Sequence, residues 1–376
     1  MKKVGIITFH ASHNCGSMLQ AYALQEIIKN RYHCEVEIID FSNYEQRNLY
    51  GIIDFRPKKS AVKNTLQKIT HLPTVIRSRH DYEEFLHKYF MLSKDKYRKT
   101  SQLEVLDGKY DILVAGGDQV WNVRCDDSDL AYFLNFAQKS KKVSFSPSLG
   151  ATNINKYAKN KQLYKKLLLD FDGISVREKN GQIWLQELLG KDVPIIADPT
   201  MLLTAEEWCS SLPVEDIKEK YIFYYAFSYQ NKANLENIQK VSRQTGLPVY
   251  VIDGKQYRAY GLNKYGFRLY KQTGPLAFLA LMKNADLVFS QSFHGTIFAA
   301  MFNRNFWAFH NSTIKNPDDD RATYILHQLG LDDRYINIEH VDEIDIWKEY
   351  DGTVVKDKIK SLQKDAFDYL EKNING

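Results

Sequence analysis

Side chains able to transfer protons and bind anions occur in several short stretches of this 376-residue sequence. The candidates for acid–base chemistry are His294, Asp118 and His10, since histidine has an unperturbed pKa of about 6.5 and can give or take a proton. Arg177 can bind a carboxylate or a phosphate through two parallel hydrogen bonds. Each of these residues follows a short apolar run, which places it where a strand would end.

The stretch around His294 has the character of an anion-binding helix start. Ser292 precedes it, and Gly295 and Thr296 follow it. The free N–H groups at a helix N-terminus attract an anion, which favours a functional role for this histidine. The simpler interpretation is a hydrogen-bonded loop histidine. Likewise, Arg177 taken alone is typical of a surface salt bridge.

Short apolar runs alternate with helical stretches along the first half of the chain. Strands are predicted at residues 3–9, 36–40, 110–115, 143–146, 173–176 and 194–197, with helices at 18–29, 155–170 and 181–189. Ser17 and Gln20 match a capping box at the start of the first helix. This alternation is typical of a doubly wound parallel sheet. Ligands of such sheets bind beyond the carboxyl ends of the strands, where the candidate residues lie.

A second series of the same kind begins after a polar stretch at residues 210–220. Strands are predicted at 221–227, 249–252, 287–290 and 306–309, with helices at 234–244, 275–283, 295–302 and 322–329. We predict an α/β protein with two Rossmann-like domains, residues 1–210 and 216–376, that face each other across a cleft as in the GT-B architecture. A final helix at 354–372 is expected to pack back on the N-terminal domain.

Positive charge is concentrated in one segment. The formal net charge is +5, yet residues 56–99 contain twelve Lys or Arg and four Asp or Glu. We predict a basic helical insertion at about 56–100 in the N-terminal domain. A solvated face is its simplest interpretation, and contact with an anionic acceptor or an anionic membrane surface is the alternative. Nucleic-acid binding is not expected, because no nucleic-acid-binding motif accompanies the charge.

The sequence favours neither a metal nor a cofactor. The four cysteines form no CxxC pair, and the glycines at 116–117 lack both the GxGxxG and the GKS/T pattern. The acidic runs at 126–129 and 318–320 resemble DxD metal motifs but are typical of solvated loops. Isolated thiols fit a reducing compartment, and no apolar run approaches the ~18 residues of a membrane span. We therefore expect a cytoplasmic protein, with its basic segment allowing contact with the inner face of the membrane.

Seven motifs follow one another along the chain: GIITFHASHNCGSMLQAYALQ, DILVAGGDQVWN, YFLNF, VSFSPSLG, ISVRE, ADPTMLL and ADLVFSQSFHGTIFAAMFN. This ordered set resembles the polysaccharide pyruvyl transferase family over residues 1–335. The resemblance implies a GT-B-like fold. It also implies transfer of pyruvyl from phosphoenolpyruvate to a sugar, usually forming a cyclic ketal. Phosphoenolpyruvate is a donor substrate, so no cofactor is expected.

The resemblance implies roles for individual residues. Arg177 stands where the family has an arginine assigned to phosphoenolpyruvate, and His294 stands where it has a histidine near the donor. Several members have Arg-Leu-His where this chain has Ser-Phe-His at 292–294. A positive charge is therefore absent at Ser292, and Arg321 or Lys315 is the candidate replacement.

The expected site has a donor side and an acceptor side. The donor side comprises Arg177, Gly295, Thr296, Ser292 and Arg321. His294 is the first candidate for acid–base catalysis, and Asp118 and His10 are second candidates from the facing domain. The acceptor side comprises His13, Asn14, Gly16, Ser17, Gln119 and Trp121. Stacking of Trp121 on a sugar and burial of the same ring in a core are both open.

Two other functions fit the same features. A GT-B glycosyltransferase could hold the diphosphate of a nucleotide sugar at the same helix start. A non-catalytic carbohydrate-binding or assembly protein is compatible with the missing arginine at position 292. The preferred prediction is a phosphoenolpyruvate-dependent pyruvyl transferase that acts on a sugar of a polysaccharide or of its lipid-linked precursor.

Overall fold

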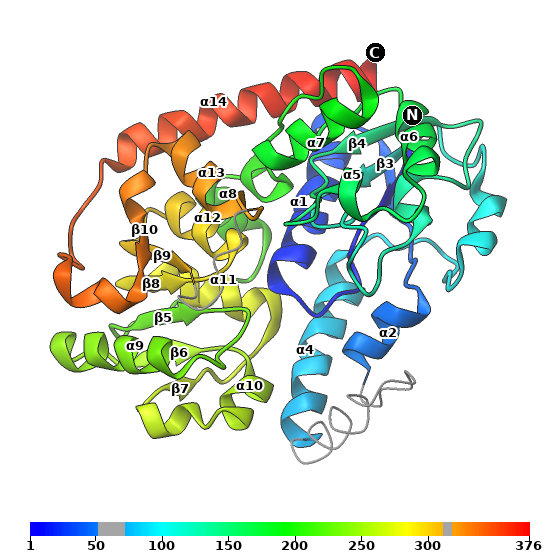
Figure 1. Ribbon diagram of the computed structural model, residues 1–376. Coiled ribbons are helices and arrows are strands. Elements are labelled where there is room, and N and C mark those ends of the chain that lie inside the picture. The colour runs from blue at the N-terminus through cyan, green and yellow to red at the C-terminus, as the bar shows by residue number, and fades with distance from the viewer. Residues whose placement is uncertain (52–71, 311–317) are drawn as a thin grey trace.

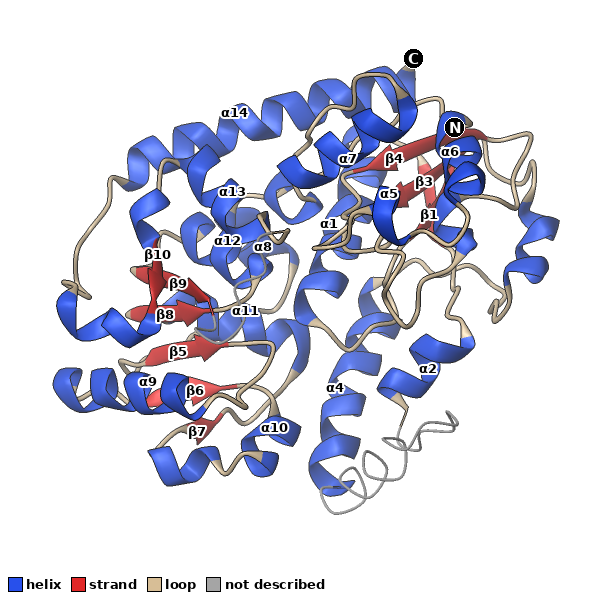
Figure 2. Ribbon diagram, viewed as in Figure 1, coloured by secondary structure: helices blue, strands red, loops and turns tan. Residues whose placement is uncertain are grey.

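The computed structural model describes residues 1–51, 72–310 and 318–376. Figures 1 and 2 show two α/β halves, each built around one parallel sheet with helices packed against it. Every residue of the strands β3 (Ile112–Gly116) and β8 (Leu287–Ser290) is buried. Helices on both faces of a parallel sheet cause this burial, which explains why these strands are unbroken apolar runs in the sequence.

The N-terminal sheet has four strands in the order β2-β1-β3-β4, and all its pairings are parallel. The strands other than β3 are β1 (Lys3–Ile7), β2 (Glu35–Ile38) and β4 (Lys141–Phe145). The predicted strands at 173–176 and 194–197 form only isolated bridges. Serine side chains replace part of the backbone ladder there. The hydroxyl of Ser144 accepts from the Ser175 N–H (2.8 Å), and the hydroxyl of Ser175 accepts from the Ser146 N–H (3.0 Å).

Helices and short 3-10 turns surround this sheet. The helices are α1 (Cys15–Tyr32), α2 (Tyr44–Tyr50), α4 (Leu72–Tyr89), α5 (Ile154–Tyr157), α6 (Lys161–Leu169), α7 (Lys179–Leu189) and α8 (Ala205–Ser211). The 3-10 turns are η1 (Thr100–Leu106), η2 (Leu130–Phe133) and η3 (Pro199–Leu202). Of the predicted basic insertion, residues 56–71 lie outside the described residues, and the part that follows contains α4.

The start of α1 differs from the predicted capping box. The side chain of Asn14 caps the helix by accepting from the Ser17 N–H (3.2 Å). The Ser17 hydroxyl instead donates to the carboxylate of Asp118, and Gln20 donates to the Ser17 carbonyl (2.9 Å). Asparagine is as good an N-cap as serine. Because Asn14 caps the helix, the Ser17 side chain is available for a tertiary contact with Asp118.

The C-terminal sheet has six parallel strands in the order β10-β9-β8-β5-β6-β7. The strands besides β8 are β5 (Ile222–Tyr225), β6 (Val249–Val251), β7 (Arg268–Leu269), β9 (Phe306–His310) and β10 (Tyr335–Asn337). The edge strands β7 and β10 were not predicted, because two or three residues are too short to form an apolar run. Its helices are α9 (Lys232–Thr245), α10 (Gly254–Ala259), α11 (Gly274–Asn284), α12 (Phe293–Met301), α13 (Arg321–Leu329) and α14 (Gly352–Leu370).

The last helix, α14, runs along both halves in Figure 1. The amide of Gln363 donates to the carbonyl of Met201 (2.7 Å), and the Tyr369 hydroxyl donates to the carbonyl of Ser144 (2.8 Å). Both acceptors belong to the N-terminal half. The end of the chain therefore contacts the domain in which the chain began.

The two halves also share apolar core. The ring of Trp208, in α8, lies 5.8 Å from that of Tyr22 in α1 and 5.4 Å from that of Phe298 in α12. These contacts join the helix after β1 to the helix after β8. None of the helices in the described part of the chain is both long and apolar enough to cross a bilayer.

Truncation of Leu370 tests the contribution of α14 to this packing. Leu370 is fully buried, so Leu370→Ala should lower the free energy of unfolding by about 2–5 kcal/mol in a urea titration. Val354 lies on the same helix and is 48% exposed, so Val354→Ala should change it by less than about 0.5 kcal/mol. Equal effects of the two substitutions would contradict a structural role for the buried face.

Candidate active site

A buried guanidinium is the centre of the site. The Arg177 side chain is 1% exposed, and its Nη1 donates to Oδ2 of Asp198 at 2.6 Å. Two further carboxylates face it at longer range. Asp118 Oδ1 lies 3.8 Å from Nη2, and Glu178 Oε2 lies 3.6 Å from Nε. The guanidinium stacks 4.2 Å from the ring of Phe293.

Both halves of the molecule supply this cluster. Arg177 follows the isolated bridge between Val176 and Ile195, and Asp198 caps η3 by accepting from the N–H and hydroxyl of Thr200 (3.0 and 2.7 Å). Phe293 is the first residue of α12 in the C-terminal half. The carboxyl ends of the two sheets therefore meet at Arg177, as ligand sites in open α/β sheets do.

His294 is the second residue of α12 and joins the cluster through Asp198. Its Nε2 lies 3.5 Å from Oδ2 of that carboxylate. A β-carbon added to Gly16 would lie 2.1 Å from Nδ1 of His294. Only glycine at position 16 therefore lets the start of α1 approach the imidazole. Gly16, which we predicted to contact an acceptor, therefore makes room for His294.

The carboxylates beside Arg177 differ in their tendency to ionise. Burial opposes ionisation of Asp198, but His294 and Arg177 hold the pKa of this carboxyl well below its usual range. Burial raises the pKa of Glu178 to about 7, although Arg177 and Arg321 oppose the change. At neutral pH Asp198 is therefore ionised, whereas Glu178 is present in both its protonated and its ionised form.

Three buried polar atoms of this cluster have no hydrogen-bond partner: Nε of Arg177, Oε2 of Glu178 and Nε2 of His294. Most buried polar groups in folded proteins are paired, so unpaired ones require an explanation. Each of them faces a charged neighbour just beyond hydrogen-bond distance, since Nε of Arg177 lies 3.6 Å from Oε2 of Glu178 and Nε2 of His294 lies 3.5 Å from Asp198. A carboxylate beside an imidazole also orients the ring and stabilises its protonated form. The cluster thus brings a guanidinium, a group suited to anions, next to an imidazole, a group suited to proton transfer.

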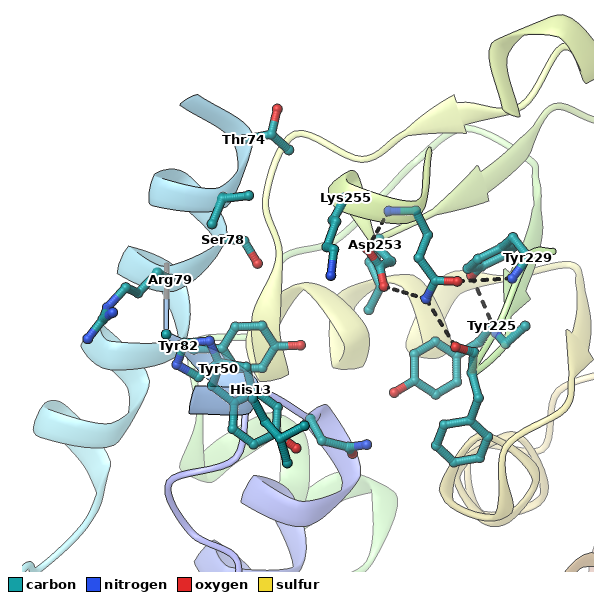
Figure 3. Close-up of a pocket in the computed structure, with 18 residues that line it drawn as sticks. His13, Tyr50, Thr74, Ser78, Arg79, Tyr82, Tyr225, Tyr229, Asp253 and Lys255 are labelled. Atoms are coloured by element: carbon teal, nitrogen blue, oxygen red, sulfur yellow. Dashed lines mark hydrogen bonds between the residues drawn. The ribbon is translucent and has the colours of Figure 1, made fainter. Parts of the chain in front are cut away.

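A cavity of about 330 Å³ lies between the two halves, and none of the cluster residues lines it (Figure 3). His13 and Tyr82 line it from the N-terminal half, with their rings stacked at 5.0 Å and 4°. Tyr225, Asp253 and Lys255 line it from the C-terminal half. Asn14 lines the cavity, and Gly16, two residues further along the same loop, lies against His294 of the cluster.

Comparison with known proteins gives the family. The sequence model of the family described as polysaccharide pyruvyl transferase matches residues 14–313, which include Arg177, Asp198 and His294. The chain belongs to the polysaccharide pyruvyl transferase family. It is therefore a transferase of the kind that acts in polysaccharide pyruvylation. A comparison with curated protein sequences gives no significant match.

Solved structures give the fold. S. aureus MnaA in its UDP co-structure is 13% identical, with a TM-score of 0.53, over 100% of this chain and 97% of that chain. The UDP-GlcNAc 2-epimerase of Methanocaldococcus jannaschii, in complex with UDP-GlcNAc and UDP, is 14% identical with a TM-score of 0.49. That match covers 97% of this chain and 100% of the other. The GT-B-like fold predicted for this pyruvyl transferase family member is confirmed, and identity at this level shows the fold alone.

The start of α12 corrects our expectation for the donor side. Ser292 caps the helix, and its hydroxyl accepts from the Gly295 N–H (3.4 Å). Its carbonyl accepts from the N–H and hydroxyl of Thr296 (2.9 and 3.0 Å). The N–H groups expected to hold the donor are thus used inside the helix. Serine is a preferred N-cap, so the helix itself accounts for this arrangement.

Arg321 lies near the cluster but is held by its own loop. Its Nε and Nη2 form a bidentate pair with Asp319, both at 2.7 Å. The neighbouring Asp320 accepts from the Asn180 N–H of α7 at 2.8 Å, so this loop docks across the two halves. The charge of Arg321 nevertheless opposes the rise in the pKa of Glu178. Lys315, the other candidate cation, lies outside the described residues.

Two expected site residues lie elsewhere. Trp121 is 1% exposed, stacks on Phe133 (5.6 Å, 12°) and donates to the carbonyl of Tyr132 (3.0 Å). Its ring is part of the core, so of the two interpretations left open for Trp121 the structure supports burial, and its place among the acceptor-side residues is wrong. His10 is fully buried, and its Nε2 lies 3.6 Å from Asp40. Asp40 does not belong to the Arg177 cluster, so His10 is paired elsewhere.

The remaining candidates divide between the loops. His13 and Asn14 line the cavity. The Ser17 hydroxyl binds Asp118, and Gln119 accepts from the amide of Asn122 in its own loop (3.0 Å). Among the described residues, no group of three or more His, Cys, Asp and Glu side chains is placed to bind a metal ion.

Sequence reasoning missed two carboxylates of the site. Asp198 caps η3 with one oxygen and binds Arg177 with the other. Glu178 adjoins Arg177 in the chain and lies 3.6 Å from its Nε. Their signal was present, since both follow predicted strands, at 173–176 and 194–197. His294 itself is only 5% exposed.

The raised pKa of Glu178 predicts a pH-dependent stability. The folded protein holds this proton up to about pH 7, whereas the unfolded chain releases it near its ordinary pKa of about 4.5. The stabilising contribution of protonated Glu178 is complete below that lower pKa and is lost as the pH rises through 7. Glu178→Gln should remove this loss. Between pH 5 and 8 the free energy of unfolding of the wild type should fall by about 1–3 kcal/mol relative to that of the variant, as measured in urea titrations. Exposed Glu236, as Glu236→Gln, should follow the wild-type profile. Parallel profiles for wild type and Glu178→Gln would contradict the raised pKa.

Proposed function

We propose that this family member transfers pyruvyl from phosphoenolpyruvate to two hydroxyls of a sugar, forming a ketal. The acceptor is a sugar of a polysaccharide or of its lipid-linked precursor. The observation that carries the proposal is the meeting of Arg177, Asp198 and His294 in one buried cluster to which both halves of the molecule contribute. Membership of the family supports the reaction class.

The reaction requires a proton donor, a proton acceptor and a binding site for an anion. The methylene carbon of phosphoenolpyruvate gains a proton and becomes a methyl group, which makes C2 electrophilic. A sugar hydroxyl adds to C2 and loses its proton. Inorganic phosphate then leaves with the bridging oxygen, and a second hydroxyl adds to C2 as it loses its own proton. One of the two hydroxyl protons replaces the proton given to the methylene carbon, and the other leaves on phosphate as HPO4²⁻. Atoms and charges balance with no oxidant or metal in the scheme.

The cluster offers a side chain for each task. His294 donates the proton to the methylene carbon, and Asp198 orients the imidazole and stabilises its charge. Arg177 binds the donor through Nε and Nη2. These two atoms lie 3.6 Å from Glu178 and 3.8 Å from Asp118, which is beyond hydrogen-bond distance. On this proposal Asp118 receives the hydroxyl proton, and its contact with the Ser17 hydroxyl of the acceptor loop supports that role.

The cavity between the two halves suits a sugar. Its stacked His13 and Tyr82 rings offer apolar faces, while Asp253, Lys255 and Asn14 offer polar partners. On this proposal the acceptor enters from the cavity and presents its hydroxyls to the cluster. Action at the inner face of a membrane, through the basic segment, belongs to the same proposal for a lipid-linked acceptor.

A ligand comparison tests the donor. Phosphoenolpyruvate at 100 times its dissociation constant should stabilise the protein by about 2.7 kcal/mol. With a sugar acceptor, it should release inorganic phosphate and add the mass of a pyruvyl ketal to the acceptor. Stabilisation by a nucleotide sugar and none by phosphoenolpyruvate would support a GT-B glycosyltransferase instead.

Substitution of His294 tests the proton donor. His294→Ala should lower kcat at least ~10²-fold if the imidazole transfers a proton. His294→Gln should restore part of the rate only if a hydrogen bond suffices. Phosphate release per folded molecule is the measurement, because the ion pair with Asp198 also contributes to stability. Exposed His327, which pairs with Asp332, provides the control His327→Ala. A normal kcat for folded His294→Ala would remove this residue from the mechanism.

A further inference from the structure

A second cavity, of about 250 Å³, adjoins the one between the two halves. The two cavities share His13, Tyr50, Arg79 and Tyr82 in their walls. The stacked rings of His13 and Tyr82 thus contribute to the walls of both cavities. A ligand in the first cavity would contact side chains that also border the second.

Positive charge dominates the second cavity. Its lining contains four cationic side chains: Arg47, Arg79, Lys96 and Arg98. It contains two acidic side chains, Asp40 and Glu83. Asp40 is buried and shared, since Lys96 lies 3.9 Å from it and Arg98 lies 3.8 Å from it. One carboxylate cannot neutralise both, so an excess of positive charge faces the cavity.

Two of the arginines are held together on one residue. Nη1 of Arg47 donates to the carbonyl of Ser42 at 2.5 Å, and Nη1 of Arg98 donates to the hydroxyl of Ser42 at 2.9 Å. Burial, and then the charge of Arg98, lower the pKa of Arg47. Ser42 thus holds two guanidiniums that repel each other. An oxyanion bound to both would reduce this repulsion.

We propose that this second cavity binds an oxyanion, a carboxylate or a phosphate, carried by the acceptor sugar. The inference rests on the proposed function, because it takes the first cavity as the place of the sugar. Arg79 borders both cavities and pairs only loosely with Glu83 at 3.5 Å. A sugar stacked on the His13 and Tyr82 rings would direct a charged substituent toward Arg47 and Arg98. The cavity would then select charged sugars over neutral ones.

Matched sugars test this selection. Dissociation constants are measured at low ionic strength for glucuronic acid, glucose 1-phosphate and glucose on the full-length protein. We expect at least one charged sugar to bind about tenfold or more tightly than glucose. The double variant Arg47→Gln/Arg98→Gln should lose this preference. The control Lys161→Gln/Lys166→Gln removes the same charge from exposed positions on α6 and should retain it.

Inorganic phosphate distinguishes a free anion from a sugar substituent. Weaker binding of phosphate than of glucose 1-phosphate is expected, because the sugar adds contacts in the first cavity. Equal binding of the two would overturn the assignment to an acceptor. Equal binding of all three sugars by the wild type, or loss of the preference in the control, would overturn the charge selection.

Phosphoenolpyruvate binding, measured on the same proteins, separates this inference from the proposed function. Binding of phosphoenolpyruvate without any preference for a charged sugar would overturn the inference and leave the function in place. A preference that depends on Arg47 and Arg98, in a protein that does not bind phosphoenolpyruvate, would support the cavity and overturn the donor. Loss of phosphoenolpyruvate binding in the double variant would overturn the inference, since the cavity would then hold the donor.

Discussion

The burial of the Arg177 guanidinium constrains the rest of this structure. A cation with 1% of its side chain exposed has lost its hydration, and that loss is destabilising unless nearby groups compensate. Three carboxylates and an aromatic ring provide the compensation here. Because Phe293 comes from the C-terminal half, the compensation also sets how the two halves meet. Removing Arg177 would take away the cation that these three carboxylates share.

Asp198 links this electrostatic requirement to the chemistry. One of its oxygens caps η3 and holds the loop after a strand end, and the other serves both Arg177 and His294. The same carboxylate is thereby a helix cap, half of an ion pair and the partner of an imidazole. The close approach of α1 through Gly16 completes the surroundings of His294. A small change at any of these positions would displace the imidazole.

Contacts away from the cluster maintain the arrangement of the two halves. Asp81 of α4 accepts from the N–H and hydroxyl of Thr273 (both 2.8 Å), and Asp320 reaches the start of α7. The helix α14 adds hydrogen bonds from Gln363 and Tyr369 to N-terminal carbonyls. The first cavity lies between these contacts, with one wall from each half. Its shape therefore depends on the relative position of the domains.

The sequence by itself determined the two α/β series and most strands, because fully buried parallel strands are continuous apolar runs. It also placed Arg177 and His294 at strand ends. It could not show that Trp121 is core, since an aromatic residue in a loop fits a core and a sugar site equally well. Nor could it show that Ser292 is occupied as a cap, or that Asp198 binds both Arg177 and His294. Those outcomes were decided by the tertiary structure, because an ion pair forms only where folding brings distant residues within a few ångströms and removes water from between them.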